Sequence, residues 1–510
     1  MSFLWEPSRM KTTESRPLPV LGQTGPESSS PQPVWSDAPV VGFVSLGCAK
    51  NLVDSEMMLA NIAESGAIVS GDEAAADTIV VNTCGFLSAS RDEALDVLRE
   101  LAERKRAGTL RRIIVAGCLV QRDGRKLLEA VPEIDALVGV NNREDVASVV
   151  WELREREERP PQQRPRGLKS AARDRDVELH LGDYHAQPWS DQGRLRLTPR
   201  HYAYVRISEG CNQKCTFCTI PSIRGPMHSK SPDQLVAECR ELTADGAREI
   251  ILIGQDTTSY GADIGYQPGL AGLLRRLDAE ISEARWIRLM YVYPSVMTDA
   301  MIDAIAESER FVKYIDIPLQ HINDRVLKSM HRRVTRARTE ALLEKLRTRI
   351  AGVTIRTTFI VGFPGETESE FTELVEFVRD FRFDMVGAFQ FSLEAQTPSG
   401  RMAGQIENAV KAERYERLML AQQEIALSAA RGRIGQSFKV VVDGDADERG
   451  VCARHAGQAP EVDSVCLLPD GGFEPGEFVA VRCVDTDDYD LAVQPSRRPQ
   501  RSTGPRDSGP

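Results

Sequence analysis

A run of three closely spaced cysteines lies just after the midpoint of this 510-residue chain. Cys211, Cys215 and Cys218 follow an apolar strand predicted over 202–207 and a glycine-containing turn over 208–210. Three thiolates this close can share one small inorganic centre, because a loop of that length can curl around it. Iron–sulfur clusters usually take four cysteine ligands, and the loop holds no fourth cysteine. A four-iron cluster here would therefore keep one iron open to a substrate.

Zinc and disulfides are the two plain alternatives for this run. A zinc site needs four nitrogen or sulfur ligands, which His228 or Cys239 could complete. Cys239, however, shares one face with Leu235 and Leu242 in a helix predicted to begin at 231–233, which indicates a packed core thiol. A disulfide framework fits poorly, because ten cysteines are few for a chain of this length and no export signal is present.

The region 38–154 is predicted to form an open parallel-sheet domain. Short β-rich runs alternate there with helical patterns, which is typical of βαβ units. The predicted strands are 40–45, 78–81, 112–116 and 136–140, and the clearest helices are 54–65 and 90–107.

Each of the first three predicted strands is followed within two or three residues by a cysteine with a glycine beside it. The cysteines are Cys48, Cys84 and Cys118, and the glycines are Gly47, Gly85 and Gly117. The carboxyl ends of parallel strands share one edge of a sheet, where ligands bind, and glycine lets the backbone approach a bulky group. The sequence therefore predicts a second metal site of three cysteines.

The region 155–198 is highly charged and shows little apolar periodicity, which favours a flexible connector. The region 199–430 then contains six predicted strands separated by helices, enough for a partial (β/α)6 barrel. Those strands are 202–207, 249–254, 286–293, 314–317, 354–361 and 385–391. Polar or glycine-rich motifs follow the strand ends, where the active sites of such barrels lie.

The last region with a globular pattern, 431–495, is predicted to be a small antiparallel β-barrel, with strands at 437–442, 465–468 and 477–484. The tails over 1–37 and 496–510 are predicted to be disordered. No apolar run is long enough to span a membrane, and a reduced cytoplasmic setting suits unpaired cysteines. The net charge of −11 argues mildly against a nucleic-acid partner.

The cysteine loop resembles that of the radical S-adenosylmethionine (SAM) superfamily, in which an aromatic residue, here Phe217, precedes the third cysteine. Together with the cysteine-bearing first domain, it resembles the methylthiotransferases, and the stretch 45–56 (SLGCAKNLVDSE) is similar to the signature of their RimO branch. The motifs at 82–86, 254–258 and 357–367 match as well, and the last domain resembles a TRAM domain. The stretch 391–397 departs from the family pattern.

The resemblance implies two [4Fe-4S] clusters, one on each cysteine trio, with SAM cleaved at the first and sulfur delivered from the second. It also implies candidate SAM contacts: Phe217, Gly254, Gln255, Asp256, Gly362 and Gly365. Each glycine-containing loop among them could equally be a structural turn. We assign no catalytic acid or base, and expect His321 to serve packing.

The RimO branch acts on an aspartate of the twelfth protein of the small ribosomal subunit and needs a low-potential electron donor such as flavodoxin or ferredoxin. Two alternatives remain open: a tRNA adenosine methylthiotransferase of the same architecture, and a non-catalytic metal-binding RNA adaptor. The region 431–495 carries six Lys and Arg against thirteen Asp and Glu. Because phosphate binding depends on Lys and Arg, this charge balance favours a basic protein substrate over tRNA.

Overall fold

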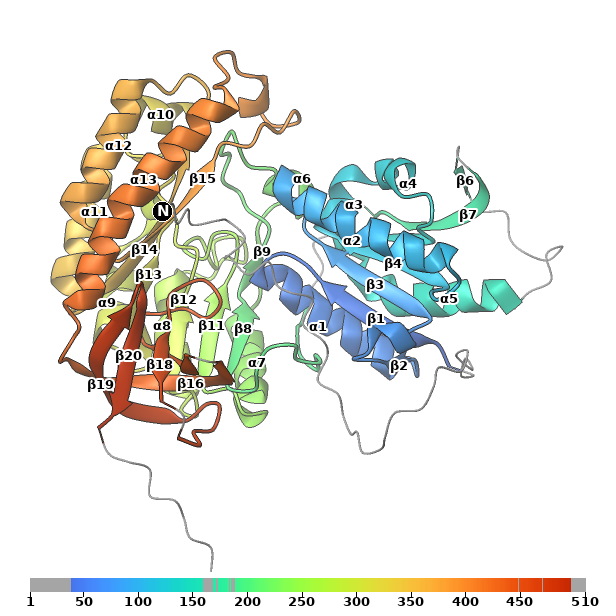
Figure 1. The fold of residues 1–510 in the computed structure, drawn as a ribbon, viewed down its shortest axis with the longest axis horizontal. Helices are drawn as coiled ribbons and strands as arrows, with labels where there is room; N and C mark the ends of the chain where they lie inside the picture. The colour runs from blue at the N-terminus through green and yellow to red at the C-terminus, as the bar shows by residue number, and fades with distance from the viewer. Residues whose placement is uncertain are drawn as a thin grey trace, which may run out of the picture.

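The computed structural model describes residues 38–158, 168–170, 173–182, 184, 189–447, 449–469 and 471–496. Three bodies follow one another along the chain: a parallel-sheet domain, a partial barrel and a small closed barrel (Figure 1). The predicted tails lie outside the described residues, apart from Ser496. No helix in the described part combines the length and apolarity that crossing a bilayer requires.

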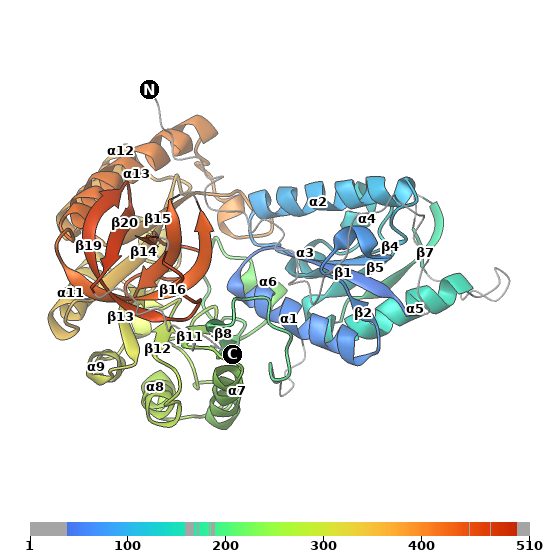
Figure 2. The ribbon, with the colours of Figure 1, turned by 60° about the horizontal axis from the view of Figure 1, so that its bottom comes forward.

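The N-terminal domain is a seven-stranded sheet in the order β2-β1-β3-β4-β5-β7-β6. The strands are β1 (Val40–Ser45), β2 (Ile68–Val69), β3 (Thr78–Thr83), β4 (Arg112–Gly117), β5 (Ala136–Gly139), β6 (Leu168–Ser170) and β7 (Arg173–His180). The helices are α1 (Ala49–Glu64), α2 (Ser88–Arg106), α3 (Cys118–Asp123), α4 (Lys126–Ala130) and α5 (Val146–Glu158). Figure 2 shows α2 and α4 on one face and α1 and α5 on the other. Because both faces are covered, every residue of β3, β4 and β5 is buried. The predicted parallel sheet is confirmed.

The region predicted as a flexible connector is partly ordered, so that prediction is wrong for much of 155–198. β7 pairs in parallel with β5 and extends the sheet, with Val177 buried in the core. Further along, Asp191 and Arg194 are also buried. The sequence did not indicate this structure, because the region is rich in charged residues. A buried charge is stable only when it is paired, and the partners of these charges lie far away in sequence.

The central domain is a six-stranded parallel sheet in the order β15-β14-β13-β12-β11-β8, as predicted. The strands are β8 (Tyr202–Arg206), β11 (Glu249–Ile253), β12 (Trp286–Leu289), β13 (Phe311–Asp316), β14 (Thr354–Val361) and β15 (Met385–Gln390), and the short pair β9 (Ser208–Glu209) and β10 (His228–Ser229) stands apart. The helices are α6 (Ile220–Ile223), α7 (Pro232–Ala244), α8 (Gly269–Glu280), α9 (Asp299–Glu307), α10 (Asp324–Ser329), α11 (Arg336–Arg349), α12 (Glu368–Phe381) and α13 (Asn408–Arg431). Ser231 caps α7 as predicted, and Cys239 is a buried core thiol within it.

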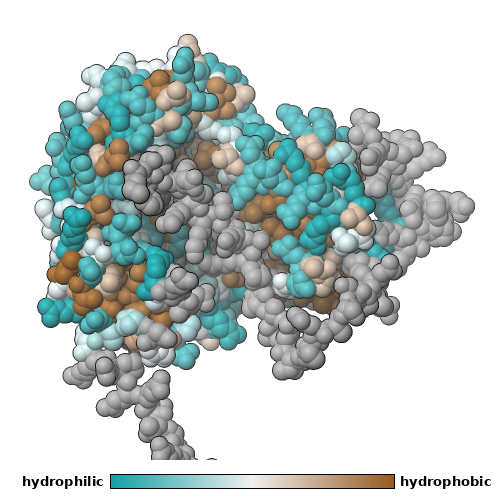
Figure 3. Space-filling view, in the orientation of Figure 1, coloured by the Kyte–Doolittle hydropathy of each residue, from teal (hydrophilic) through white to brown (hydrophobic). Residues whose placement is uncertain are grey.

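The C-terminal domain is a closed barrel in the order β16-β17-β18-β20-β19. Its strands are β16 (Ser437–Asp447), β17 (Gly450–His455), β18 (Cys466–Leu468), β19 (Phe478–Asp487) and β20 (Asp490–Pro495). The sequence did not predict β17 or β20, and the pair β18–β20 is parallel while the other pairs are antiparallel. On the face in Figure 3, hydrophobic residues gather over this domain, where Ile434 and Val484 are exposed.

The C-terminal domain closes the end of the partial barrel at which the strands begin. Glu249, the first residue of β11, accepts from Arg288 (2.7 Å) and from Arg454 of β17 (2.8 Å), and all three are buried. In the loop after β17, Asp463 accepts from Tyr314 Oη (2.7 Å) and Ala459 is buried among barrel side chains. The opposite end, where the strands finish, is thereby left as the accessible mouth.

We expect Glu249→Gln to lower the free energy of unfolding by about 3–5 kcal/mol, because two buried arginines lose their shared countercharge. Urea denaturation followed by circular dichroism measures this loss. The matched control is Asp96→Asn, since the Asp96–Arg99 pair is exposed and such pairs contribute about 0–1 kcal/mol. Equal losses in the two variants would contradict the assignment of Glu249 as the anchor of the C-terminal domain.

Candidate active site

The three cysteines of the central domain lie on the loop that follows β9, at the mouth of the barrel. Cys211 and Cys218 are half-buried, and Cys218 N donates to Cys215 O (3.2 Å). Burial raises the pKa of Cys211 to about 11 and of Cys218 to about 12. Such thiols ionise readily only when a metal supplies positive charge, so the site suits a cation-bearing centre.

Four contacts from distant segments fix this loop. Thr216 donates through N and Oγ1 to the carbonyls of Met330 (3.1 Å) and Ser329 (2.9 Å), and Ser399 N donates to Thr216 O (3.0 Å). Gln213 Nε2 donates to Asp256 Oδ2 (2.9 Å). The loop is therefore pre-arranged by the barrel rather than left to fold around its ligand.

The three cysteines of the N-terminal domain also come together, at the ends of β1, β3 and β4. Cys48 precedes α1 and Cys118 opens α3. The thiols act on one another: after burial, Cys48 raises the pKa of Cys84, and both contribute to raising the pKa of Cys118 to about 12. A Cβ on Gly47, which has φ +99°, would stand 2.7 Å from Cys84 Cβ. The glycine beside Cys48 therefore lets two of the cysteines approach each other.

The stretch that carries Cys48 also faces the barrel. Lys50 Nζ lies 3.3 Å from the centroid of the Tyr291 ring, across the domain boundary. Desolvation opposes ionisation of Cys48, but the charges of Lys50 and Arg224 and the backbone N–H groups of Lys50 and Asn51 together outweigh it and lower the pKa of this thiol. The N-terminal trio thus lies in a positive environment that both domains supply.

A cluster of charged residues joins the two domains next to these cysteines; we call it the interdomain ion cluster. It consists of Asp54, Arg206, Glu209 and Arg224, which are buried, and Arg143, which is half-buried. Asp54 accepts from Arg206 Nη1 (2.5 Å) and Arg224 Nη2 (2.7 Å). Glu209 accepts from both Nη atoms of Arg143 (3.1 and 3.0 Å) and from Arg224 Nη1 (2.5 Å). Burial alone would raise the pKa of Glu209, but Arg143, Arg206 and Arg224 hold it well below its usual range.

A second interdomain contact lies on the other side of the N-terminal trio. Arg122 of α3 forms a buried ion pair with Glu394, and its Nη1 donates to Gly85 O (2.7 Å), beside Cys84. Two ion-paired contacts therefore fix the N-terminal domain against the barrel.

The expected SAM contacts have different surroundings. The carboxylate of Asp256 accepts hydrogen bonds from the side chains of Gln213, Thr258 and Ser259. In contrast, both side-chain polar atoms of Gln255 are buried without a partner among the described residues. A Cβ on Gly254 would stand 2.9 Å from Ser208 Oγ, and one on Gly362 would stand 2.4 Å from Lys411. Gln255 is thus the member of this set with unused hydrogen-bonding capacity.

Three further residues have structural contacts. Phe217 packs against a cluster that contains Phe363 and Phe391, and Gly365 N donates to Gly404 O (2.8 Å). His321 is fully buried and accepts from Asn323 N (3.0 Å), and burial lowers its pKa to about 3. A neutral, packed His321 agrees with the expectation from the sequence.

Three regions of the chain match known families. Residues 40–139 match the family described as UPF0004, residues 205–378 the radical SAM superfamily, and residues 434–495 the TRAM domain. The chain is 42% identical over 456 residues to "Ribosomal protein uS12 methylthiotransferase RimO" of Desulforamulus reducens, covering 89% of this chain and 98% of that one. It is 41% identical over 469 residues to the protein of the same name from Anaeromyxobacter sp. (strain K), covering 91% and 95%.

The chain belongs to the RimO family. Membership makes it a radical SAM methylthiotransferase that uses an iron–sulfur cluster and SAM. The radical SAM methyltransferase TsrM from Kitasatospora setae, solved with tryptophan and a SAM analogue, shares the fold of this RimO-family chain: the TM-score is 0.50 at 15% identity, covering 71% of this chain and 75% of that one.

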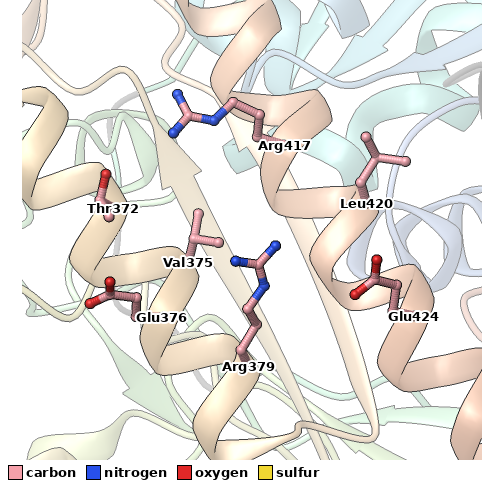
Figure 4. Close-up of a pocket in the computed structure, with 7 residues that line it drawn as sticks. All are labelled: Thr372, Val375, Glu376, Arg379, Arg417, Leu420 and Glu424. Carbon is pink, nitrogen blue, oxygen red and sulfur yellow. The ribbon is translucent and has the colours of Figure 1, made fainter.

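A groove of about 320 Å³ between α12 and α13 lies on the outer face of the barrel. Figure 4 shows Arg379 and Arg417 extending into it from opposite helices. Arg417 is paired with Glu368 and Glu413, and no cysteine lines the groove. It therefore belongs to the helix packing of this RimO-family chain and not to its cysteine sites.

Sequence reasoning missed two arginines that lie beside the cysteine sulfurs. Arg224 of the barrel lies 3.3 Å (Nε) from Cys118 Sγ, and Arg332 Nη1 lies 3.9 Å from Cys215 Sγ. Neither stands in a recognisable spacing with its cysteine, because each reaches it from another segment. Only the position of Arg224, soon after Cys218 in the chain, could have hinted at such a role.

One carboxyl group near the barrel mouth, that of Glu366, is expected to make the folding stability depend on pH. Glu366 Oε2 accepts from the N–H groups of Gly362 (2.6 Å) and Phe363 (3.0 Å). Burial raises the pKa of Glu366 from 4.5 to about 7, although Arg414 and the two N–H groups oppose the rise. The native state therefore binds more protons than the unfolded chain between about pH 4.5 and 7, and stability falls as pH rises through that window.

We expect Glu366→Gln to remove up to about 3 kcal/mol of this pH dependence, since each pKa unit corresponds to about 1.4 kcal/mol. Urea unfolding at a series of pH values measures it. Glu376→Gln, at an exposed position on α12, is the control and should leave the slope of the unfolding free energy against pH unchanged. The same slope in wild type and Glu366→Gln would show that Glu366 does not titrate in this range.

Proposed function

We propose that this protein adds a methylthio group to the β-carbon of an aspartate in ribosomal protein uS12, using two cysteine-held iron–sulfur clusters and SAM. The observation that carries the proposal is that both cysteine trios lie at one domain boundary, with a barrel residue, Arg224, in contact with the N-terminal trio. The curated relatives, at about 40% identity over most of the chain, bear the uS12 methylthiotransferase name.

The donor sets fit iron–sulfur clusters better than single zinc ions. A tetrahedral zinc, with bonds of about 2.3 Å to sulfur, would draw its cysteine sulfurs to within about 4 Å of one another. In the described part of the chain, neither trio has all three sulfurs within 4.8 Å of one another. Cys211, Cys215 and Cys218 would hold one cluster, and Cys48, Cys84 and Cys118 the other.

When bound, the clusters and SAM supply the electron transfer, hydrogen abstraction and sulfur that no protein side chain can provide at an unactivated C–H bond. The role of this chain is to bind and orient the cofactors and the substrate and to shield them from water. Ser208 Oγ and both polar atoms of Gln255 are buried without a partner among the described residues. Each such atom costs about 1–3 kcal/mol if left unpaired, which supports polar contacts to SAM from these two side chains.

The packing of the two outer domains against the barrel favours exclusion of water from its mouth. The C-terminal domain seals one end through Glu249 and Arg454, and the interdomain ion cluster brings the N-terminal domain to the mouth. A closed chamber protects reactive intermediates from side reactions. The two interdomain contacts therefore serve the chemistry as well as the fold.

Charge supports a protein substrate over tRNA, the alternative. The C-terminal domain carries thirteen acidic residues against six basic ones, a surface that disfavours phosphate and attracts a basic ribosomal protein. The electron donor we propose is a low-potential protein such as flavodoxin or ferredoxin. A cytoplasmic site of action would keep the six cysteines reduced.

We expect anaerobic reconstitution to yield about eight iron atoms per chain, four for each cluster. Replacing either cysteine trio with alanine should remove about half of that iron, because each trio holds its own centre. Cys239→Ala is the matched control and should keep all of it, since Cys239 lies in the hydrophobic core. Iron and protein assays give the ratio. One or two zinc ions per chain and no SAM cleavage would refute the proposal.

We expect uS12 from cells that carry this gene to be heavier by one methylthio group in place of hydrogen than uS12 from a deletion strain. Intact-protein mass spectrometry measures the difference, and Cys215→Ala should behave as the deletion. Methylthiolated adenosine in tRNA, measured in the same strains, is expected not to change. Loss of the tRNA modification with unaltered uS12 would establish the alternative function.

A further inference from the structure

We propose that Arg224 is a positioning residue that raises the reduction potential of the cluster on Cys48, Cys84 and Cys118 and fixes this cluster relative to the barrel loop. The inference rests on the proposed two-cluster function, and it assigns to a barrel residue the tuning of a centre bound by the other domain. Cysteine spacing gives no indication of it.

The guanidinium group of Arg224 is held on every side. Its Nε donates to Cys118 Sγ (3.3 Å), Nη1 to Glu209 (2.5 Å), and Nη2 to Asn51 (2.8 Å) and Asp54 (2.7 Å). The side chain is 2% exposed. Because the guanidinium is planar and its donors have fixed directions, these contacts leave it one orientation, with Nε directed at the sulfur.

The backbone near Arg224 connects the two cysteine sites. Arg224 directly follows α6, which begins two residues after Cys218. Ile223 at the end of α6 packs with Cys118 and Val140 in one small buried cluster. Figures 1 and 2 both show α6 between the barrel and α3. The short segment 219–224 therefore begins beside one cysteine trio and ends against the other.

A donor and a positive charge at a ligand sulfur stabilise the reduced, more negative form of an iron–sulfur cluster, so they raise its potential. The effect is strong here because the contact is buried, where the local dielectric is low. The barrel trio has a weaker counterpart in Arg332, 3.9 Å from Cys215 Sγ. Arg224 thus distinguishes the electronic surroundings of the two centres.

The test uses the full chain with Cys211, Cys215 and Cys218 replaced by alanine, so that only the N-terminal cluster is observed. In this background, an EPR-monitored reductive titration compares wild-type Arg224 with Arg224→Met. We expect Arg224→Met to shift the midpoint potential to a more negative value, because the sulfur loses both its N–H donor and the nearby charge. An unchanged potential would overturn the inference.

Arg143→Met is the matched control, since Arg143 belongs to the same ion cluster and pairs with Glu209 but has no hydrogen bond to a cysteine among those described. We expect the midpoint potential of the N-terminal iron–sulfur cluster in Arg143→Met to stay at the wild-type value. A shift equal to that of Arg224→Met would assign the effect to the interdomain ion cluster as a whole and overturn the specific role of Arg224. If Arg224→Met retains no iron, Arg224→Lys decides instead. Lysine keeps the charge but cannot reach the sulfur and both carboxylates together, so a more negative potential supports the inference and an unchanged one overturns it.

Failure of the proposed function would be seen separately. If the triple-alanine background binds no iron at all, the second cluster is absent and the two-cluster proposal fails. If it binds about four irons with the same potential in every Arg224 variant, the two-cluster proposal stands and only the role of Arg224 fails.

Discussion

The buried pairing of Asp54 and Glu209 with three arginines is the constraint on which the arrangement of this protein depends. Asp54 comes from the N-terminal domain and Glu209 from β9, the short strand that leads into the barrel cysteine loop. Charges removed from water are stable only when several partners compensate them. These charged hydrogen bonds have fixed directions and join the two domains, so they hold the cysteine sites in one relative position.

This constraint explains the composition of the stretch 45–56. Cys48 belongs to the N-terminal cysteine trio, whereas Lys50 contacts Tyr291 of the barrel and Asp54 pairs with Arg206 and Arg224. Glu56 accepts from the backbone N–H groups of Leu197 and Thr198 in the connecting segment. A single helix, α1, therefore begins directly after Cys48 and continues as a contact surface for the barrel and the connecting segment.

Much of the fold follows from local pattern. The alternation of apolar strands with helices predicts both parallel sheets, and the helix face shared by Leu235, Cys239 and Leu242 identifies Cys239 as a core residue. The connector was misread because β7 carries more charge than apolar character, and its pairing with β5 is a long-range event. β17 and β20 were missed for a similar reason: short barrel strands draw their stability from closure, which no local window contains.

The sequence by itself determined the six cysteines, the glycines beside three of them, and the order of sheet, barrel and terminal domain, because these depend on residue type and short-range periodicity. Tertiary structure alone decided which residues surround the sulfurs. Arg224 reaches Cys118, and Glu394 reaches Arg122, across separations that leave no periodic trace. Burial makes those contacts strong, and burial is a property of the assembled domains rather than of any stretch of chain.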